Sequence, residues 1–495
     1  MTPGRRAWWA LLAPLSALVL WQATWRRAGQ YLLDGAIASP RLVLATHLIA
    51  IAVGALAAAR GRIVTPWRAP RLLAAMSLAC GIAPVAAQIA FDGERAIVVV
   101  LFTFAVVVGV VLGALAATLG RTLPGLAFPR EQLLDALQVR SLALTMVLGL
   151  VFFVIAERVG PVRTTLALAV IAAVIAHAGA SALAPSALAS HVSRRVIAGT
   201  AYALVVLAIA VETIAPWLEA THYADAVVYG FTTQHGRVVL TSGRGAFQLY
   251  EGSAMRLSTI DAHRRREITA QPAMAAATGR ESVLVIGGGE GLATREVLRY
   301  PDVKRVTVVE PDDALIHAAQ NQPIVLRENA AAFRDPRVTV VRADPLPWLR
   351  EHDDRWNVIL VDLPEPDSPA RSKLFTTYFY RLVRGHLAPG GTGAIAGPSP
   401  TMLPRGWASI LASLASAELH PRPYHANLPT VGVMGYALIG DHDVEAPTHV
   451  PMPCAWLDDD VLAEAFHLAS DERTPTDVAE NLMWRQVLMR YRDEP

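Results

Sequence analysis

The chain has 495 residues, of which 53% are hydrophobic, and a formal net charge of +2 at pH 7. A composition this apolar is unusual for a soluble protein and predicts a part embedded in lipid. The nearly balanced charge gives no support for a nucleic-acid partner. With only two cysteines, Cys80 and Cys454, the sequence excludes a disulfide framework and a thiolate metal site, and we expect no bound metal.

Residues 1–220 predict an N-terminal all-α polytopic membrane domain. About seven apolar segments are long enough to cross roughly 30 Å of hydrocarbon, at residues 7–25, 42–59, 72–91, 96–119, 141–156, 164–184 and 196–217. Loops on the side of the N-terminus carry more arginines, which places that terminus in the cytoplasm. We therefore expect a multi-pass protein of the bacterial inner membrane, with the lipid bilayer as a partner.

The composition becomes charged and turn-rich from residue 221 onwards. Alternating apolar segments at 226–231 and 237–240 predict a β-rich lead-in over residues 221–280. Strands then alternate with helices over residues 281–495, and the strands are expected at 283–286, 306–309, 338–341, 358–361 and 393–396. Repeated βα units predict a parallel sheet that binds ligands at the carboxyl ends of its strands.

A glycine-rich turn joins the first of these strands to its helix. Gly287, Gly288 and Gly289 follow the apolar strand and precede Glu290. Glycines let the backbone approach a ligand closely, so the turn indicates a nucleotide site. Four successive strands are each followed by an acid, namely Glu290, Glu310, Asp344 and Asp362. Because the carboxyl ends of parallel strands face one crevice, these acids strengthen the prediction.

The residues around the glycines indicate the type of nucleotide. No lysine follows them, which excludes a phosphate-binding P-loop. Leu292 stands where a dinucleotide-binding turn has its third glycine. Glu290 would repel a pyrophosphate but suits a cationic sulfonium nucleoside. With a cytoplasmic N-terminus, an odd number of spans would place the C-terminal half outside. Such nucleosides are abundant only in the cytoplasm, so either one span is miscounted or the catalytic half faces outward, and we expect the soluble domain in the cytoplasm.

Five longer motifs stand in the C-terminal part of the chain. They read VLVIGGGEGLATREVL at 283–298, DPRVTVVRAD at 335–344, VDLPEPDSP at 361–369, LFTTYFY at 374–380 and YHANLPTVG at 424–432. Together they closely resemble the spermidine synthase (polyamine aminopropyltransferase) family, and the apolar N-terminal segments make the chain look most like its membrane-fused bacterial branch. The resemblance covers residues 226–491. It implies a C-terminal α/β class I methyltransferase-like (Rossmann-like) domain and a transferase of polyamine biosynthesis.

The resemblance implies transfer of an aminopropyl group from decarboxylated S-adenosylmethionine to an amine acceptor, giving methylthioadenosine without a tightly bound cofactor. Glycines 287–289 and Glu290 match the motif that holds the donor's amine, and Glu310 matches the ribose-binding acid. Asp344 matches the acid that reads the adenine amino group, although a helix cap is a simpler interpretation of this residue. Asp362 matches the catalytic base, which accepts a proton from the attacking amine.

The acceptor side departs from the family pattern. Where the family has Gln, Tyr, and Gln or His, this chain has Arg256, Arg265 and Arg266. An arginine beside a cationic amine costs on the order of 1 to 4 kcal/mol for an unscreened pair, which makes putrescine a doubtful acceptor. The residues expected to bind the acceptor are these three arginines with Asp261, Glu365 and Tyr436.

Several interpretations of the arginines stay open. The run of Arg264, Arg265 and Arg266 could form a solvated helix face that lies against anionic lipid or pairs with Glu267 and Asp261. The substituted positions could instead form a pocket rebuilt for a carboxylate or phosphate of the acceptor. A third interpretation is a degenerate nucleoside-binding domain in a transporter or sensor, whose membrane half acts through Glu212 and His177. An S-adenosylmethionine-dependent methyltransferase is the rival enzyme. We also expect a small-molecule amine or an altered acceptor, and a homodimer, as partners.

Overall fold

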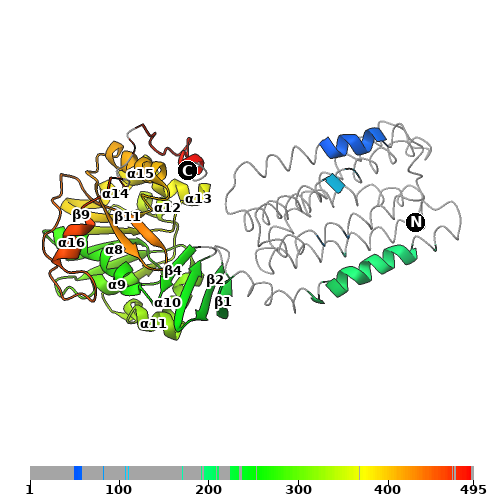
Figure 1. Ribbon diagram of the computed structural model, residues 1–495, viewed down its shortest axis with the longest axis horizontal. Coiled ribbons are helices and arrows are strands. Elements are labelled where there is room, and N and C mark those ends of the chain that lie inside the picture. The colour runs from blue at the N-terminus through cyan, green and yellow to red at the C-terminus, as the bar shows by residue number, and fades with distance from the viewer. Residues whose placement is uncertain are drawn as a thin grey trace. The chain divides into compact units, whose positions relative to one another are not determined.

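The computed structural model describes residues 49–57, 78, 82, 106–107, 110, 170, 191, 194–207, 209–210, 223–232, 237–251, 254–366, 368–470, 472, 475 and 477–491. The chain divides into two compact units, Met1–His222 and Tyr223–Pro495. Both sheets belong to the second unit, and some of their strands are labelled in Figure 1. The second unit therefore contains the strand ends on which the sequence places the ligand site.

The described residues of the first unit are helical, and the longest run among them covers residues 194–207. Within the described part of the chain, no helix has the length and apolar character needed to cross a membrane. The predicted fold class is therefore wrong in its polytopic membrane domain, and the predicted multi-pass inner-membrane localisation is corrected with it. Much of the seven predicted segments, with Glu212 and His177, lies outside the described residues.

The second unit begins with a four-stranded antiparallel sheet. Its strands follow one another in sheet order as β1 (Ala226–Thr232), β2 (Arg237–Gly243), β3 (Ala246–Glu251) and β4 (Ala254–Ser258). The β2–β3 hairpin turns on Arg244 and Gly245, which have φ of 50° and 78°, as suits a two-residue turn between twisted strands. Leu240 and Leu249 pack in one core with α10 (Asp313–Asn321). This packing fixes β3 and β4 beside the larger sheet.

A seven-stranded mixed sheet forms the centre of the unit, in the order β10-β11-β9-β8-β5-β6-β7. The parallel strands are β5 (Ser282–Gly287), β6 (Arg305–Val309), β7 (Val338–Val341), β8 (Trp356–Asp362) and β9 (Leu387–Gly397). β10 (Arg422–Leu428) and β11 (Gly432–Gly440) form a hairpin, and β11 runs antiparallel to β9. The predicted parallel sheet is therefore corrected to a mixed one, because a short turn can only join antiparallel strands. From β5 the chain adds β6 and β7 on one side and then β8 on the other side, so the strand order reverses between β5 and β8. Such sheets bind ligands at this point.

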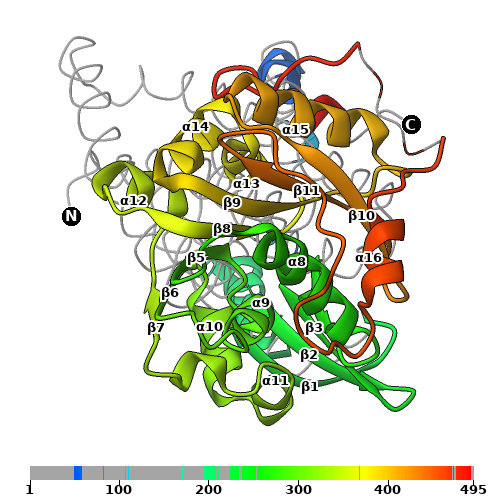
Figure 2. The same ribbon diagram turned by 90° about the vertical axis from the view of Figure 1, so that its left-hand side faces the viewer.

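Helices cover both faces of the large sheet (Figure 2). One face carries α8 (Ala262–Ala276), α9 (Leu292–Val297) and α16 (Asp459–Ala465), and the other carries α12 (Pro345–Glu351), α14 (Thr377–His386), α15 (Pro404–Ser416) and α17 (Leu488–Tyr491). The β5 side chains alternate between the two cores, with Val283 and Val285 in the first and Leu284 and Ile286 in the second. A strand buried on both faces gives a continuous apolar run, which ends here at the glycine turn. Shorter elements are α11 (Pro323–Glu328), α13 (Pro369–Ser372), η4 (Ala332–Arg334) and η5 (Lys373–Phe375).

Candidate active site

The glycine turn after β5 lies against the end of β8. Gly287 is in register with Asp362, and the N–H of Gly288 donates to the Asp362 carbonyl oxygen at 3.0 Å. Gly287 and Gly288 have φ of 80° and 64°, in the region that favours glycine. A Cβ at Gly287 would clash with the Asp362 carbonyl oxygen. The turn therefore needs glycine in order to bring Glu290 beside Asp362.

Glu290 and Asp362 form a buried carboxyl pair with relative exposures of 0% and 1%. Burial raises the pKa of Glu290 to about 6, against the opposing charge of Arg256. Burial also tends to raise the pKa of Asp362, but Arg265, Arg256 and a hydrogen bond from Glu290 together lower it below its usual value. When two carboxyl groups share a buried site, their pKa values move apart, so one is ionised more readily than the other. Asp362 is the group that stays ionised, and Glu290 is the one that takes up a proton more readily.

Arg256 reaches from β4 into this pair and is 1% exposed. Its Nη2 donates to Glu290 Oε2 at 3.2 Å and to the Asp362 carbonyl oxygen at 3.0 Å. Its Nε lies 3.7 Å from Glu251 Oε2, and Glu251 Oε1 accepts from Arg371 at 3.0 Å. Burial opposes the charge of Arg256, yet the acids around it raise its pKa. The sequence placed Arg256 with the acceptor, whereas the structure puts its guanidinium beside the carboxylate expected to hold the donor's amine.

Arg265 holds the other side of Asp362. Its Nη2 donates to Asp362 Oδ1 at 3.2 Å from α8, and its side chain is 13% exposed. Burial opposes its charge, but Asp362 raises the pKa of Arg265. Tyr436 on β11 lies within electrostatic range of Arg265 and Asp362. Burial raises the pKa of its phenol to about 12, while the charge of Arg265 opposes that rise. The structure therefore brings Arg265, Asp362 and Tyr436 close together.

Glu310 packs on the glycine turn from the end of β6. Its Oε2 accepts from the N–H of Gly289 at 3.2 Å and its Oε1 from the N–H of Asp312 at 2.9 Å. A Cβ at Gly289 would come within 2.5 Å of Glu310 Cγ, so only glycine allows this approach. Burial, with the charge of Glu251, raises the pKa of Glu310 to about 8. Glu310 thus contacts the same glycine turn that carries Glu290.

Three predicted site residues make other contacts. Asp344 caps α12 by accepting from the N–H of Leu346 at 3.1 Å, and its second oxygen accepts from Lys373. Asp261 accepts from the backbone N–H and the hydroxyl of Thr430 at 2.8 and 2.7 Å, which ties the start of α8 to the β10–β11 turn. The third, Arg266, points away from Asp362 and enters a separate polar network.

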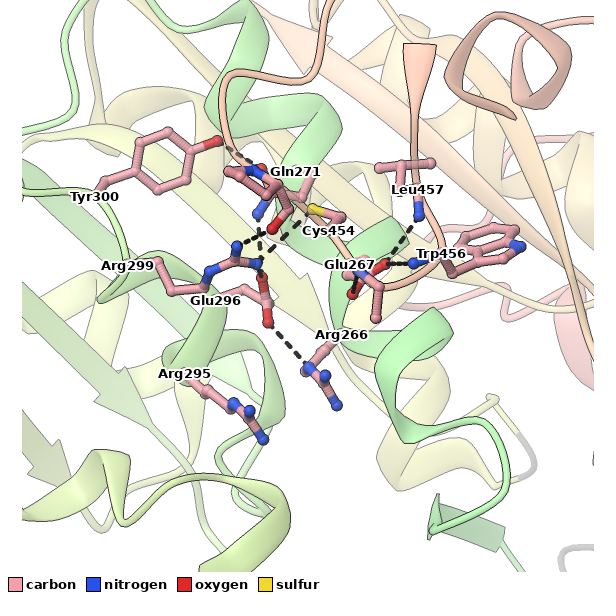
Figure 3. A network of polar contacts seen from close by, with 12 residues as sticks. Arg266, Glu267, Gln271, Arg295, Glu296, Arg299, Tyr300, Cys454, Trp456 and Leu457 are labelled. Carbon is pink, nitrogen blue, oxygen red and sulfur yellow. Dashed lines mark hydrogen bonds and ion pairs between the residues drawn. The ribbon is translucent and has the colours of Figure 1, made fainter. Parts of the chain in front are cut away.

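That network, shown in Figure 3, is centred on Glu296 of α9, which is 1% exposed. Glu296 accepts from Arg266 Nε at 2.9 Å, from Gln271 at 3.1 Å and from Arg299 at 2.5 Å. Beside it, Glu267 accepts from the backbone N–H groups of Ala455, Trp456 and Leu457, each at 2.9 Å. We call Arg266, Gln271, Glu296 and Arg299 the α8–α9 clamp. Arg264 stacks on Trp456, while Arg265 and Arg266 bind Asp362 and Glu296, so these three arginines do not form a solvated face paired with Glu267 and Asp261.

A cavity of about 440 Å³ opens beside the carboxyl pair. Its charged lining residues are Arg256, Arg265 and the exposed Glu365, and most of the remaining lining is apolar or aromatic. Sequence reasoning missed several contributors, among them Tyr250, Met255, Phe375, Met434, Leu488 and Tyr491. It also missed Glu251, Arg371 and Lys373. Arg371 and Lys373 lie between the motifs at 361–369 and 374–380. Their place between two motifs was a signal in the sequence that could have identified them.

Comparison with known proteins gives one family and several relatives. The spermine/spermidine synthase domain family matches residues 263–446. Polyamine aminopropyltransferase 2 of Ralstonia nicotianae is 35% identical over 280 residues, which cover 56% of this chain and 55% of that protein. Polyamine aminopropyltransferase of Oceanobacillus iheyensis is 32% identical over 251 residues, covering 50% and 49%. A crystal structure of spermidine synthase from Thermotoga maritima covers 49% of this chain and 84% of its own at 22% identity and a TM-score of 0.45. The chain spans about half the length of the curated relatives it matches.

Proposed function

We propose that this chain, whose residues 263–446 match the spermine/spermidine synthase domain family, transfers an aminopropyl group from decarboxylated S-adenosylmethionine to an amine acceptor. The observation that carries the proposal is Asp362, a buried carboxylate with a lowered pKa at the end of β8. It lies beside the acid-bearing glycine turn, at the switch point of a Rossmann-like sheet. The curated relatives carry the name of this activity.

Asp362 is suited to the proton transfer that this reaction needs. A protonated amine has no lone pair, so the acceptor must lose a proton as it attacks. The ionised Asp362 would accept that proton. The amine nitrogen then forms a bond to the donor's terminal propyl carbon, and the bond from that carbon to sulfur breaks. The electron pair stays on sulfur, so the sulfonium becomes the neutral thioether of methylthioadenosine.

The donor would bind along the ends of β5, β6 and β7. Glu290 in the glycine turn would face the donor's amine, and Glu310 would accept from the ribose hydroxyls. Asp344 at the end of β7 would read the adenine amino group. Its contact with Lys373 leaves it 40% exposed on its side chain, so its cap on α12 and an adenine contact can coexist. These roles are proposals that the positions of the three acids support.

The lead-in over residues 221–280 and the Rossmann-like domain over 281–495 are proposed to act as one catalytic unit. The cavity takes Tyr250, Met255 and Arg256 from the first range and Tyr436 from the second. The first range alone lacks Asp362, and the second alone lacks Arg256. We also propose a homodimer as the oligomeric state, which the elution volume of the purified chain would test.

Calorimetry and product analysis test the proposed function. The purified chain is titrated with decarboxylated S-adenosylmethionine, S-adenosylmethionine and methylthioadenosine, and methylthioadenosine release is then measured with a panel of amines. We expect the decarboxylated donor to bind, and Asp362→Asn to slow release by about 100-fold to 10,000-fold. Asp354→Asn is the matched control, because this exposed acid precedes the opposite end of β8. Absence of donor binding, or equal rates for both variants, would contradict the proposal.

A further inference from the structure

The charges around the cavity are already balanced before any substrate enters. Arg256 pairs with Glu290 and Glu251, Arg371 also pairs with Glu251, and Arg265 pairs with Asp362. Glu310 accepts from two backbone N–H groups. Each of these acids therefore already has a donor, and the carboxylate among the described lining residues of the cavity is that of the exposed Glu365. An unpaired ammonium moved from water into such a wall is strongly disfavoured.

The cavity wall itself selects against a polycation. Of its 20 lining residues, the charged ones are Arg256, Arg265 and Glu365. Glu365 is exposed, so water screens its attraction for a distant ammonium. Both arginines are largely buried and keep their charge over the physiological pH range. A second ammonium group in this cavity would therefore meet two guanidinium groups and one exposed carboxylate among the charged lining residues.

Arg265 has donor capacity that its protein contacts do not use. A guanidinium has five N–H groups, and in the described part of the chain Arg265 is recorded with one hydrogen bond, to Asp362. Its Nε is buried without a hydrogen-bond partner. An arginine that lines a cavity with unused N–H groups is suited to bind a carboxylate through two parallel hydrogen bonds.

We infer that the acceptor is an amine that also carries a carboxylate, so that its ammonium faces Asp362 while its carboxylate binds Arg265. This inference rests on the proposed aminopropyl transfer and names the acceptor class for it. The Arg265–Asp362 ion pair and such a zwitterion have complementary charges, so each charge gains a partner on binding. A diamine would satisfy Asp362 but leave its second ammonium facing Arg256 and Arg265.

The reaction with this acceptor forms and breaks the same bonds as the reaction with a simple amine. The acceptor's nitrogen forms the bond to the propyl carbon, the carbon–sulfur bond breaks with its electron pair on sulfur, and one proton passes from nitrogen to Asp362 and then to water. The carboxylate of the acceptor takes no part in bond making. Arg265 acts as a binding residue that reads the acceptor and holds Asp362 ionised.

A matched acceptor series tests the inference on the full chain. Methylthioadenosine release is compared for 1,4-diaminobutane, for ornithine, which adds a carboxylate to it, for 4-aminobutanoate, which replaces one ammonium by a carboxylate, and for butylamine. We expect kcat/KM for the better carboxylate-bearing amine to exceed that for the diamine by about 10-fold or more. Faster reaction of 1,4-diaminobutane would overturn the inference and leave the proposed function standing. No release with any amine would overturn both.

The variant Arg265→Gln, with Arg264→Gln as its matched control, separates recognition from simple damage. Arg264 is the preceding residue on α8, and its guanidinium stacks on Trp456 with a centroid distance of 5.4 Å. We expect Arg265→Gln to lower the ratio of kcat/KM for the carboxylate-bearing amine over the diamine by about 10-fold to 100-fold. Arg264→Gln should leave this ratio unchanged. Because a ratio cancels any loss of folded protein, an unchanged ratio in Arg265→Gln would overturn the inference.

Discussion

Two neighbouring arginines on α8 enter two buried clusters of opposite character. Arg266 joins the α8–α9 clamp, where the oxygens of Glu296 accept from Arg266, Gln271 and Arg299. Arg265 joins the carboxyl pair, where Glu290 Oε1 and Arg265 Nε are buried without a hydrogen-bond partner. A satisfied buried network contributes to folding, and unsatisfied buried polar atoms are costly unless a ligand completes them. The contrast indicates which cluster is built for chemistry.

The largest effect expected to distinguish the two clusters is a loss of stability when the α8–α9 clamp is disrupted. Glu296→Ala leaves the guanidinium groups of Arg266 and Arg299 without their carboxylate, and we expect it to lower the free energy of unfolding by about 3 kcal/mol. A urea titration measures the change. Glu281→Ala is the control, because its ion pair with Lys304 is exposed, and it should cost less than about 1 kcal/mol. Equal costs for the two variants would break the distinction.

In the carboxyl pair, removal of the Glu290 charge should raise the free energy of unfolding at neutral pH, whereas removal of Glu296 lowers it. The pKa of Glu290 is raised from 4.5 to about 6 in the folded chain, so the folded state binds more protons than the unfolded state between these values. Its contribution to stability is fully present below about pH 4.5 and is lost as the pH rises through about 6. We expect the loss in unfolding free energy from pH 4 to pH 8 to be about 2 kcal/mol smaller in Glu290→Gln than in the wild type. Parallel pH profiles would contradict this.

The same titration should govern donor binding. A cationic donor amine needs Glu290 ionised, so its affinity should rise as the pH increases through about 6. Between pH 5 and pH 7 we expect about a 10-fold gain, because the ionised fraction changes by that factor. Calorimetry with decarboxylated S-adenosylmethionine measures it, and Glu290→Gln should bind weakly with a flat profile. If the affinity of the wild type is constant over this pH range, Glu290 does not bind the donor's amine.

The smallest expected effect distinguishes the two roles of Asp344. Asp344→Asn keeps a side chain that caps α12 well, whereas Asp344→Ala loses the cap and should cost about 1 kcal/mol of unfolding free energy. If Asp344 also reads the adenine, both variants should weaken methylthioadenosine binding to a similar extent, measured by calorimetry. Weaker binding in Asp344→Ala alone would mean that the residue acts only through the helix.

Much of the central sheet could be predicted from the sequence. β7 has the expected bounds, Val338–Val341, and β5, β6 and β8 end within one residue of their expected ends. Buried parallel strands give continuous apolar runs, which are easy to recognise. The β10–β11 hairpin could not be oriented in this way, since the pattern of a strand does not reveal its direction. In the first unit, hydropathy alone led to spans that the described helices do not provide.

The candidate site was predictable in its acids and not in their partners. The glycine turn and the strand ends identified Glu290, Glu310 and Asp362, because these positions follow from local pattern. Contacts between distant segments leave no local signal: Arg256 is 34 residues from Glu290, and Arg371 is 120 residues from Glu251. A single sequence therefore placed Arg256 with the acceptor and missed Glu251 altogether.

A crystal structure with bound methylthioadenosine tests the central claim most directly, since it shows whether the unsatisfied cluster is the ligand site. We expect the ribose hydroxyls within hydrogen-bond distance of Glu310, the adenine toward Asp344, and the sulfur facing Asp362 across the glycine turn. The α8–α9 clamp should keep all its contacts. A nucleoside bound elsewhere, or one that displaces Arg266 from Glu296, would contradict the account.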